Sequence, residues 1–129
     1  MIIPMLTCKD AAAEIKFCQN AFGAVLRSER KSPDGTTTHA TLSIGASLFM
    51  VHGEVPHLNS RQPQPDGSSS VVIYLYVADT DRTVQNAVRA GATIVLPVAD
   101  QSWGDRVGRI MDPAGHVWNI ATHHAAKSE

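Results

Sequence analysis

The two halves of the chain repeat one order of predicted elements, and this repeat constrains the fold more than any other feature. Gly23-Ala24 corresponds to Gly91-Ala92, and Gly45 corresponds to Gly115, at a nearly constant offset. Each half reads as a strand, a helix and three further strands. Identity between the halves is slight, so the repeat rests on element order and spacing. We predict one α+β domain of two βαβββ modules: residues 1–54, a linker over 55–69, and residues 70–124.

The first half contains a predicted helix with recognisable ends. Asp10 is a good N-cap, and Gly23 suits the left-handed position that closes a helix. The apolar residues between them recur on one helical face, which is formed by Ala11, Ile15, Cys18 and Phe22. The strands predicted in this half are Ile2–Cys8, Ala24–Lys31, Thr36–Ile44 and Ser47–His52.

The second half follows the same plan. Asp79 or Asp81 caps its helix, and the apolar face of that helix is predicted to hold Val84, Val88 and Gly91. Residues 112–115, Asp-Pro-Ala-Gly, form a turn, because proline pre-sets φ at the second position and glycine tolerates positive φ at the fourth. The predicted strands are Ser70–Val77, Ala92–Val98, Arg106–Met111 and His116–Thr122.

Charge and apolar pattern exclude several classes of protein. A net charge of −1 argues against a nucleic-acid-binding protein, which would carry a basic patch or stripe. No apolar run approaches the ~20 residues that span a membrane, and the N-terminus MIIPML lacks the pattern of a signal peptide. We therefore expect a cytoplasmic protein in which Cys8 and Cys18 are reduced thiols. The linker is a solvated connection or, alternatively, a flap that carries His57 and Arg61.

Two segments of the chain resemble a known family. They are AGATIVLPVADQSWGDRVGRIMDPAGHVWNIATH, residues 90–123, and THATLSIGASLFMVHGE, residues 38–54. With the duplicated βαβββ pattern, they resemble the PhnB-like branch of the vicinal oxygen chelate superfamily, which includes glyoxalase I, bleomycin-resistance proteins and extradiol dioxygenases. The resemblance implies curled mixed sheets that form a cup, with helices outside and a ligand inside. It also implies a homodimer, in which module pairing within a chain or across a two-fold axis covers the sheet edges.

Family enzymes hold a metal ion in the cup through one residue from the first and the last strand of each module. The resemblance places these four positions at Ile3, at Phe49 or Met50, at Val72 and at Asn119. Divalent metals need His, Cys, Asp or Glu, with an amide oxygen as a weaker ligand, so only Asn119 could coordinate one. We therefore expect no metal and no cofactor, and we identify no catalytic residue.

Strand alternation indicates independently which side chains face the cup. In the fifth strand the apolar stripe of Val71, Ile73, Leu75 and Val77 suits a position under the helix, which leaves Val72, Tyr74 and Tyr76 on the cup side. In the third strand the polar side consists of Thr37, His39, Thr41 and Ser43. In the last strand Val117, Asn119 and Ala121 face the cup, whereas Trp118 and Ile120 face the helix, so Trp118 is predicted to be core.

The candidate ligand-binding residues follow from this alternation and from one loop. Trp103 lies in a glycine-flanked loop, where a packing role is less obvious, so we expect it to stack on a ligand. Arg109 and His39 are expected to anchor polar or anionic groups. The full set is His39, Thr41, Tyr74, Tyr76, Trp103, Arg109 and Asn119.

Each candidate has a plain structural alternative. His39 could lie on a solvated sheet face without a ligand. Tyr74 and Tyr76 could be core aromatics whose hydroxyls reach the edge. Arg109 could be a surface arginine paired with Asp105 or Asp112, a kind of pair that contributes little stability. Arg106 serves only to fix its loop in this reading. His123 and His124 are expected to face solvent.

These observations support three hypotheses of different classes. The preferred one is a metal-independent homodimer that binds a planar or aromatic small molecule in the cup, with drug or natural-product sequestration as its role. The second is a glyoxalase-like lyase or isomerase with a metal site built from His39, His52, Glu54 and His116. The third is a structural or regulatory dimer without a ligand.

Overall fold

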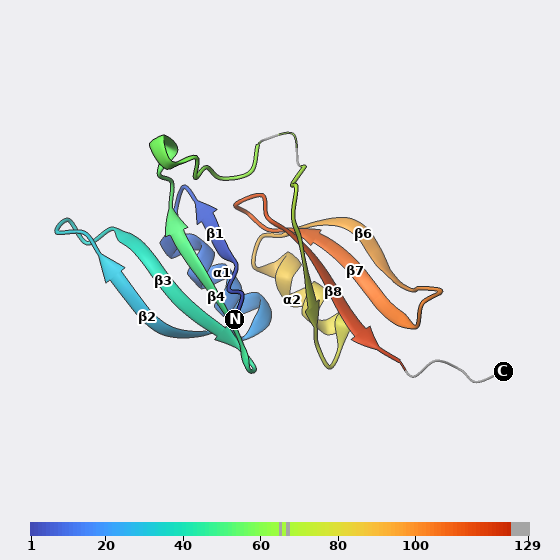
Figure 1. Cartoon of the computed structure of the whole chain (residues 1–129). Helices are drawn as coiled ribbons and strands as arrows, with labels where there is room; N and C mark the ends of the chain where they lie inside the picture. The colour runs from blue at the N-terminus through green and yellow to red at the C-terminus, as the bar shows by residue number, and fades with distance from the viewer. Residues whose placement is uncertain (65, 67, 125–129) are drawn as a thin grey trace.

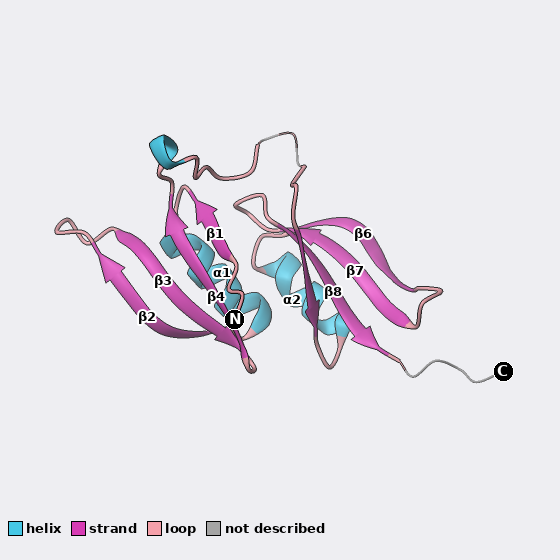
Figure 2. Cartoon of the chain, viewed as in Figure 1, coloured by secondary structure: helices cyan, strands magenta, loops and turns pink. Residues whose placement is uncertain are grey.

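The structure is a computed structural model, and it describes residues 1–64, 66 and 68–124. Two four-stranded sheets stand next to each other, and both helices lie on the same side of them, behind the sheets in Figure 1. The two helices also contact each other. Among the described residues, no helix covers the opposite sides of the two sheets, as the colouring by secondary structure shows (Figure 2).

The first module has the sheet order β1-β4-β3-β2. Strand β1 runs parallel to β4, and the remaining neighbours are antiparallel. Its elements are β1 (Met5–Cys8), α1 (Ala11–Phe22), β2 (Val25–Lys31), β3 (Thr37–Ile44) and β4 (Ser47–Gly53).

The second module repeats this topology with the order β5-β8-β7-β6. Strand β5 is parallel to β8, and the other pairs are antiparallel. Between the modules the chain forms the short 3-10 helix η1 (Pro56–Leu58). The elements of the second module are β5 (Val72–Tyr76), α2 (Thr80–Arg89), β6 (Thr93–Asp100), β7 (Asp105–Met111) and β8 (Val117–His123). The predicted α+β fold of two βαβββ modules is confirmed.

The helix ends are set by the residues that the sequence indicates. The carboxylate of Asp10 accepts a hydrogen bond from the backbone N–H of Ala13, and Gly23 ends α1 with a φ of 67°. In α2 the cap is Asp79, which accepts from the N–H of Arg82. Capping side chains satisfy backbone donors that the first helical turn leaves free.

Several details differ from the sequence-based expectation. Strand β5 is shorter than the predicted strand over residues 70–77, and Gly91 lies beyond the end of α2. Strand β1 begins at Met5 rather than Ile2, and Pro4, which has no N–H to donate, only accepts a hydrogen bond from Met50 at this end. In α2 the face toward the sheet is formed by Val84 and Ala87, whereas Val88 is exposed. Residues three positions apart lie on the same helical face, so Ala87 rather than Val88 continues the buried face that Val84 begins.

Trp118 joins the two modules in one core. The side chain is buried, and its ring lies 4.6 Å from that of Phe22 and 6.0 Å from that of Phe49, measured between centroids. Its indole N–H donates to Asp112 at 2.9 Å, which satisfies the polar atom that burial would otherwise leave unpaired. The prediction that Trp118 belongs to the core is confirmed.

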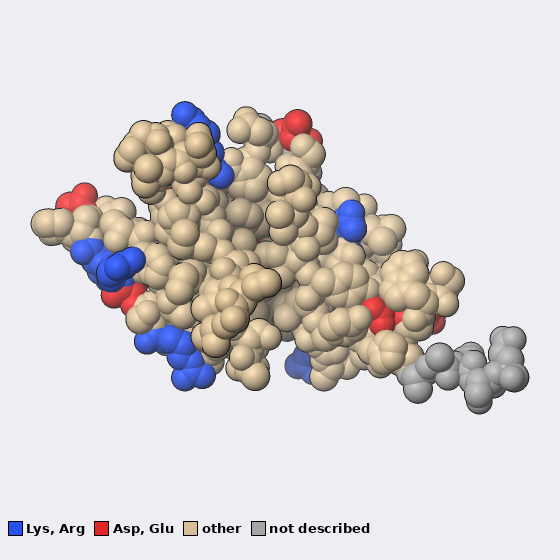
Figure 3. Space-filling model, in the orientation of Figure 1, with Lys and Arg blue, Asp and Glu red and all other residues tan. Residues whose placement is uncertain are grey.

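The strand alternation holds in both sheets except at Val71, which precedes β5 and is exposed instead of lying under the helix. Ile73, Leu75 and Val77 pack against the core, while Tyr74 and Tyr76 are exposed on the opposite side. In β3, Ala40 and Leu42 are fully buried. We call the side of each sheet that faces away from the helices its outer face. The view in Figure 3, from the side opposite the helices, shows Lys and Arg mainly toward the margin of the first module and few charges between the modules.

Within the described part of the chain, neither α1 nor α2 combines the length and the apolar character that crossing a membrane requires.

Candidate functional site

A buried carboxylate at the start of β7 gathers three side chains from neighbouring strands. Oδ2 of Asp105 accepts hydrogen bonds from the hydroxyls of Tyr74 at 2.6 Å and Tyr76 at 2.7 Å. Its Oδ1 lies 2.8 Å from Nδ1 of His123 in β8. Asp105 is only 3% exposed. The carboxylate therefore relies on these partners, and little on bulk water, for its hydrogen bonds.

These hydrogen bonds shift the pKa of the carboxylate and of the two phenols in opposite directions. The bonds from Tyr74 and His123 lower the pKa of Asp105 to about 2, so the carboxylate is ionised at neutral pH. Its acceptance of the Tyr76 hydroxyl raises the pKa of that phenol to about 12, and burial together with Asp105 raises the pKa of Tyr74. Because an ionised carboxylate only accepts, Nδ1 of His123 carries a hydrogen, and the neutral ring has its lone pair on Nε2.

The same network arranges three aromatic side chains that remain accessible. Tyr74 is 41% exposed, Tyr76 57% and Trp103 60%. The tyrosine rings lie 5.2 Å apart between centroids, and the indole N–H of Trp103 donates to the Tyr74 hydroxyl at 3.3 Å. We call Trp103, Tyr74 and Tyr76 the aromatic shelf. Their polar atoms bind inside the network, which leaves ring surface for a ligand.

Arg109 lies on the same outer face, one strand beyond β8. In the strand register, Tyr74 is paired with Asn119, and Asn119 with Arg109. Nε of Arg109 donates to Oδ1 of Asn119 at 2.7 Å. The alternative in which Arg109 pairs with Asp105 or Asp112 is therefore wrong, because Asp105 is occupied by other donors and Asp112 faces the core. Two strand spacings place the backbones of Tyr74 and Arg109 about 10 Å apart.

The loop that carries Trp103 is tied down at both ends. Arg106 binds Asp81 at the start of α2 through two nitrogens, at 2.7 and 3.0 Å, and Asp100 at the end of β6 at 3.1 Å. Gly104 takes a φ of 97°, a conformation that other residues rarely adopt. Its carbonyl accepts from the N–H of His124. Arg106 thus fixes this loop, as the sequence suggests, and the shelf gains a defined position.

The remaining candidates, His39 and Thr41, lie on the outer face of the first module. His39 pairs with Arg30 and with His52 across the strands, and the Thr7 hydroxyl lies 2.7 Å from Nε2 of His52. Partial burial, aided by Arg30 and His52, lowers the pKa of His39. Within the described residues, no hydrogen bond or ring contact links His39 or Thr41 to the aromatic shelf. One chain therefore presents two separate groups of candidate residues.

The residues present do not fit the family's metal. Ile3, just before β1, and Val72, in β5, have aliphatic side chains, so neither position offers an atom that could bind a metal ion. No three His, Cys, Asp or Glu side chains among the described residues come close enough together to hold a metal ion. The alternative set is also dispersed: Nε2 of His116 lies 2.8 Å from the Thr7 carbonyl oxygen, and Glu54 accepts from the backbone of Gln62. We therefore derive no step through a metal ion.

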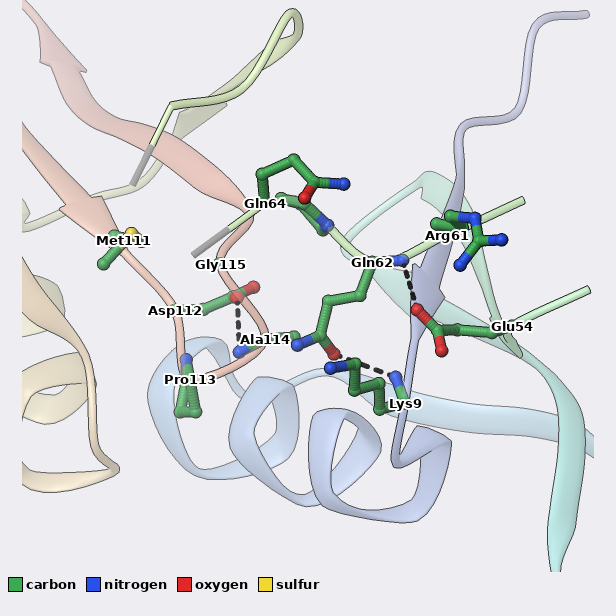
Figure 4. A pocket seen from close by; sticks show the side chains of 11 residues that line it. Lys9, Glu54, Arg61, Gln62, Gln64, Met111, Asp112, Pro113, Ala114 and Gly115 are labelled. Atoms are coloured by element: carbon green, nitrogen blue, oxygen red, sulfur yellow. Dashed lines mark hydrogen bonds between the residues drawn. The ribbon is translucent and has the colours of Figure 1, made fainter. Parts of the chain in front are cut away.

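A cavity of about 510 Å³ lies between the linker and the β7–β8 turn (Figure 4). Gln62 attaches the linker to the first module, because its side-chain oxygen accepts from the N–H of Lys9 at 2.8 Å and its own N–H donates to Glu54 at 2.9 Å. Of the two linker residues singled out from the sequence, Arg61 lines this cavity, while His57 is exposed in η1. The flap role stays a prediction.

Sequence reasoning missed two members of the network. The sequence predicts that His123 faces solvent, which holds, but it does not predict the contact with Asp105, which the sequence indicates only as a partner or neighbour of arginines. Alternation along β8 would place His123 on the outer face with Asn119 and Ala121. His123 is both exposed, at 63% of its side chain, and bound to Asp105. The signal that identifies this pair is the β7–β8 register, in which Asp105 lies directly opposite His123.

Two βαβββ modules with exposed outer sheet faces define the class of protein, and comparison with known proteins agrees with it. Residues 3–120 match the family model described as Glyoxalase/Bleomycin resistance protein/Dioxygenase superfamily. An uncharacterised protein of Mycobacterium bovis is 41% identical over 120 residues, which cover 91% of this chain and 79% of the relative. The chain belongs to the glyoxalase/bleomycin resistance protein/dioxygenase superfamily.

Solved structures agree on the fold. TioX from Micromonospora sp. ML1 is 26% identical, with a TM-score of 0.73, over 95% of this chain and 97% of its own. A gene product of Arabidopsis thaliana is 27% identical, with a TM-score of 0.75, over 94% of this chain and 97% of its own. The similarity therefore extends over nearly the whole length of each chain.

Proposed function

We propose that the protein binds a planar aromatic small molecule on the aromatic shelf without a metal ion, as a member of the PhnB-like branch, and that its role is sequestration of such a compound. The observation that carries this proposal is that Trp103, Tyr74 and Tyr76 are exposed and yet held in place through Asp105. Large aromatic side chains on a surface favour a partner that covers them.

The way the rings are held favours a ligand over a merely exposed surface. A side chain that is free before binding loses rotamer freedom when it is covered, at a cost of roughly 0.5–1.5 kcal/mol. The two tyrosine hydroxyls share one buried acceptor, and the indole N–H is bound to one of them. Much of this cost is therefore met during folding, so a flat ligand would gain the stacking contact with little further loss.

Arg109 supplies a polar anchor at a suitable distance. Its Nε is bound to Asn119, and the outer edge of a guanidinium presents two further nitrogens that suit a carboxylate or another planar anion. A ligand whose ring lies on the shelf would reach Arg109 with a substituent about 10 Å away, which is two strand spacings.

We expect Trp103→Ala to weaken binding of flat aromatic ligands by roughly 10- to 100-fold, since it removes an aromatic contact and its buried area. Trp103→Phe keeps part of the stacking surface and should lose less. Titration calorimetry with bleomycin-like and quinoxaline-like compounds gives both affinities. Arg109→Met is a matched test of the anchor, because it should lower the affinity for anionic ligands more than the affinity for neutral ones. Unchanged affinity of Trp103→Ala for every binder found would remove Trp103 from the site.

We also propose that the protein is a homodimer, with the partner copy covering the outer faces. Apolar side chains on the outer face and edge of the second sheet are exposed, among them Val72, Ile94 and Leu96. The outer face of the first module carries Arg30 and His39. Two-fold pairing of unlike modules would cover the apolar surface and bring His39 toward a shelf.

The dimer is expected as a single species at micromolar protein concentration, because exposed sheet edges and apolar faces are normally paired or covered. Analytical ultracentrifugation measures this directly. Leu96→Glu, on the apolar edge strand, should shift the protein toward monomer, whereas Leu58→Glu, on the exposed 3-10 helix, should not. A wild-type protein that sediments only as a monomer would contradict the proposal.

A further inference from the structure

We propose that Asp105 and His123 form a proton-accepting pair beside the aromatic shelf, and that the site therefore takes a hydroxylated aromatic, a phenol or a hydroxy-heteroaromatic, in its anionic form. This inference rests on the proposed function, because it assumes a ring on the shelf. It adds the chemical class of the ligand and the fate of its proton.

The geometry is that of an imidazole oriented by a buried acid. Asp105 is buried and His123 is exposed, and Oδ1 of the carboxylate lies 2.8 Å from Nδ1 of the ring. The ionised carboxylate requires hydrogen on Nδ1, so Nε2 of the neutral ring is the free acceptor. A carboxylate in this position holds the tautomer and stabilises the imidazolium that forms when Nε2 takes up a proton.

The imidazole stands next to the shelf rather than apart from it. Its ring lies 6.5 Å from that of Tyr76 between centroids, with the planes nearly perpendicular at 84°. A methyl group placed on Gly104, the residue after Trp103, would lie 3.9 Å from Cε1 of His123. A ring that stacks on Trp103 and Tyr76 therefore has His123 at its margin, where a hydroxyl substituent could donate to Nε2.

The charges around the shelf favour an anion. Tyr74, Tyr76 and His123 already donate to the carboxylate of Asp105, so most of its accepting positions are taken and few are free for a cationic ligand. The tyrosines donate their hydroxyl hydrogens to Asp105, and neither is free to protonate a ligand. Arg109 adds a positive charge on the same outer face. Within the described residues, His123 is thus the group by the shelf that is able to accept a proton.

The proton transfer balances without any further reactant. The O–H bond of the ligand breaks and its proton forms an N–H bond at Nε2, while the electron pair stays on the ligand oxygen. The products are a phenolate and an imidazolium, and the imidazolium is flanked by the ligand anion and by Asp105. No bond to carbon changes, so the step requires no oxidant and no metal ion.

The test uses para-nitrophenol, whose phenol and phenolate forms have different absorption spectra, and para-nitroanisole, which has the same ring but no acidic proton. Both are titrated into the full chain over a range of pH. We expect the phenolate-to-phenol ratio of bound nitrophenol to exceed its ratio in buffer by about tenfold, which corresponds to about 1.4 kcal/mol of ion-pair stabilisation. Nitrophenol should also bind at least tenfold more tightly than nitroanisole.

His123→Asn is the decisive variant, because its amide N–H is able to keep the hydrogen bond to Asp105 while the proton acceptor is lost. We expect it to bind both probes equally and to abolish the phenolate enhancement. Asp105→Asn removes the carboxylate that stabilises the imidazolium, so it should also lower the phenolate-to-phenol ratio of bound nitrophenol at each pH. Equal binding of both probes to the wild type, with no enhancement, would overturn the inference and leave the proposed function intact. Failure of both probes to bind at millimolar concentration would count against both.

Discussion

Replacing Glu14 by glutamine is expected to stabilise the protein, and the gain should increase with pH. Glu14 lies in the first turn of α1 and is only 2% exposed. Both of its carboxyl oxygens lack a hydrogen-bond partner among the described residues. Burial, reinforced by the neighbouring Asp112, raises the pKa of Glu14 above its ordinary value of 4.5. An uncharged amide of the same shape avoids the cost of ionisation at this position.

The direction of the pH dependence follows from proton linkage. Above pH 4.5, Glu14 is ionised in the unfolded chain but still binds its proton in the folded one. The folded state therefore holds more protons, and the free energy of unfolding falls as the pH rises through neutrality. Each pH unit costs about 1.4 kcal/mol, so the penalty approaches about 3 kcal/mol at pH 7.

Urea unfolding of the wild type and of Glu14→Gln at pH 5 and pH 8 measures both the gain and its slope. Glu29→Gln is a matched control, because Glu29 is exposed and the amide oxygen is still able to accept from Thr37. We expect the control to leave the pH slope of the wild type unchanged. A Glu14→Gln protein that is less stable than the wild type at both pH values would show that the ionised carboxylate has a partner that compensates its burial.

Asp105→Asn is expected to weaken binding of aromatic ligands by about 100-fold, the largest effect we expect for any residue of the network. Asparagine removes the negative charge and replaces one accepting oxygen by an N–H donor, so Tyr74, Tyr76 and His123 lose the charged acceptor that they share and the shelf is held less firmly. The freed rings must then be ordered by the ligand, at roughly 0.5–1.5 kcal/mol for each side chain. For Trp103, Tyr74 and Tyr76 together, this free-energy cost corresponds to a loss of affinity of about two powers of ten.

Asp100→Asn is the matched control for this experiment. Asp100 lies at the other end of the same loop, its side chain is 77% exposed, and among the described residues it binds only Arg106. The amide oxygen of asparagine is still able to accept this hydrogen bond, and Arg106 keeps both of its bonds to Asp81, so the loop should stay in place. We expect it to bind ligands as the wild type does. Near-ultraviolet circular dichroism reports in parallel whether the tyrosine and tryptophan rings have lost their fixed surroundings. Wild-type affinity in Asp105→Asn would mean that the shelf does not depend on the carboxylate.

Much of the fold is predictable from local patterns, because these patterns act over one or two turns of chain. Asp10 and Gly23 mark the ends of α1 through hydrogen bonds to residues three to five positions away. Strand alternation places Tyr74 and Tyr76 on the outer face and Trp118 in the core, since both follow from a period of two.

The parts that sequence reasoning missed depend on register between distant segments. Asp105 and His123 meet because β7 and β8 pair with one particular alignment, and neither residue is unusual within its own strand. Arg109 binds Asn119 instead of a carboxylate for the same reason. The start of β1 at Met5 and the exposure of Val88 depend on how a segment packs against its neighbours, which no local pattern reports.

The central claim, that ligands stack on the aromatic shelf, is tested most directly by tryptophan fluorescence. The chain has two tryptophans, Trp103 exposed on the shelf and Trp118 buried in the core. A flat ligand should quench the wild type on binding, and Trp103→Phe, which retains Trp118 alone, should bind the same ligand with little change in emission. Quenching of equal size in Trp103→Phe and the wild type would place the ligand near Trp118 and contradict the account.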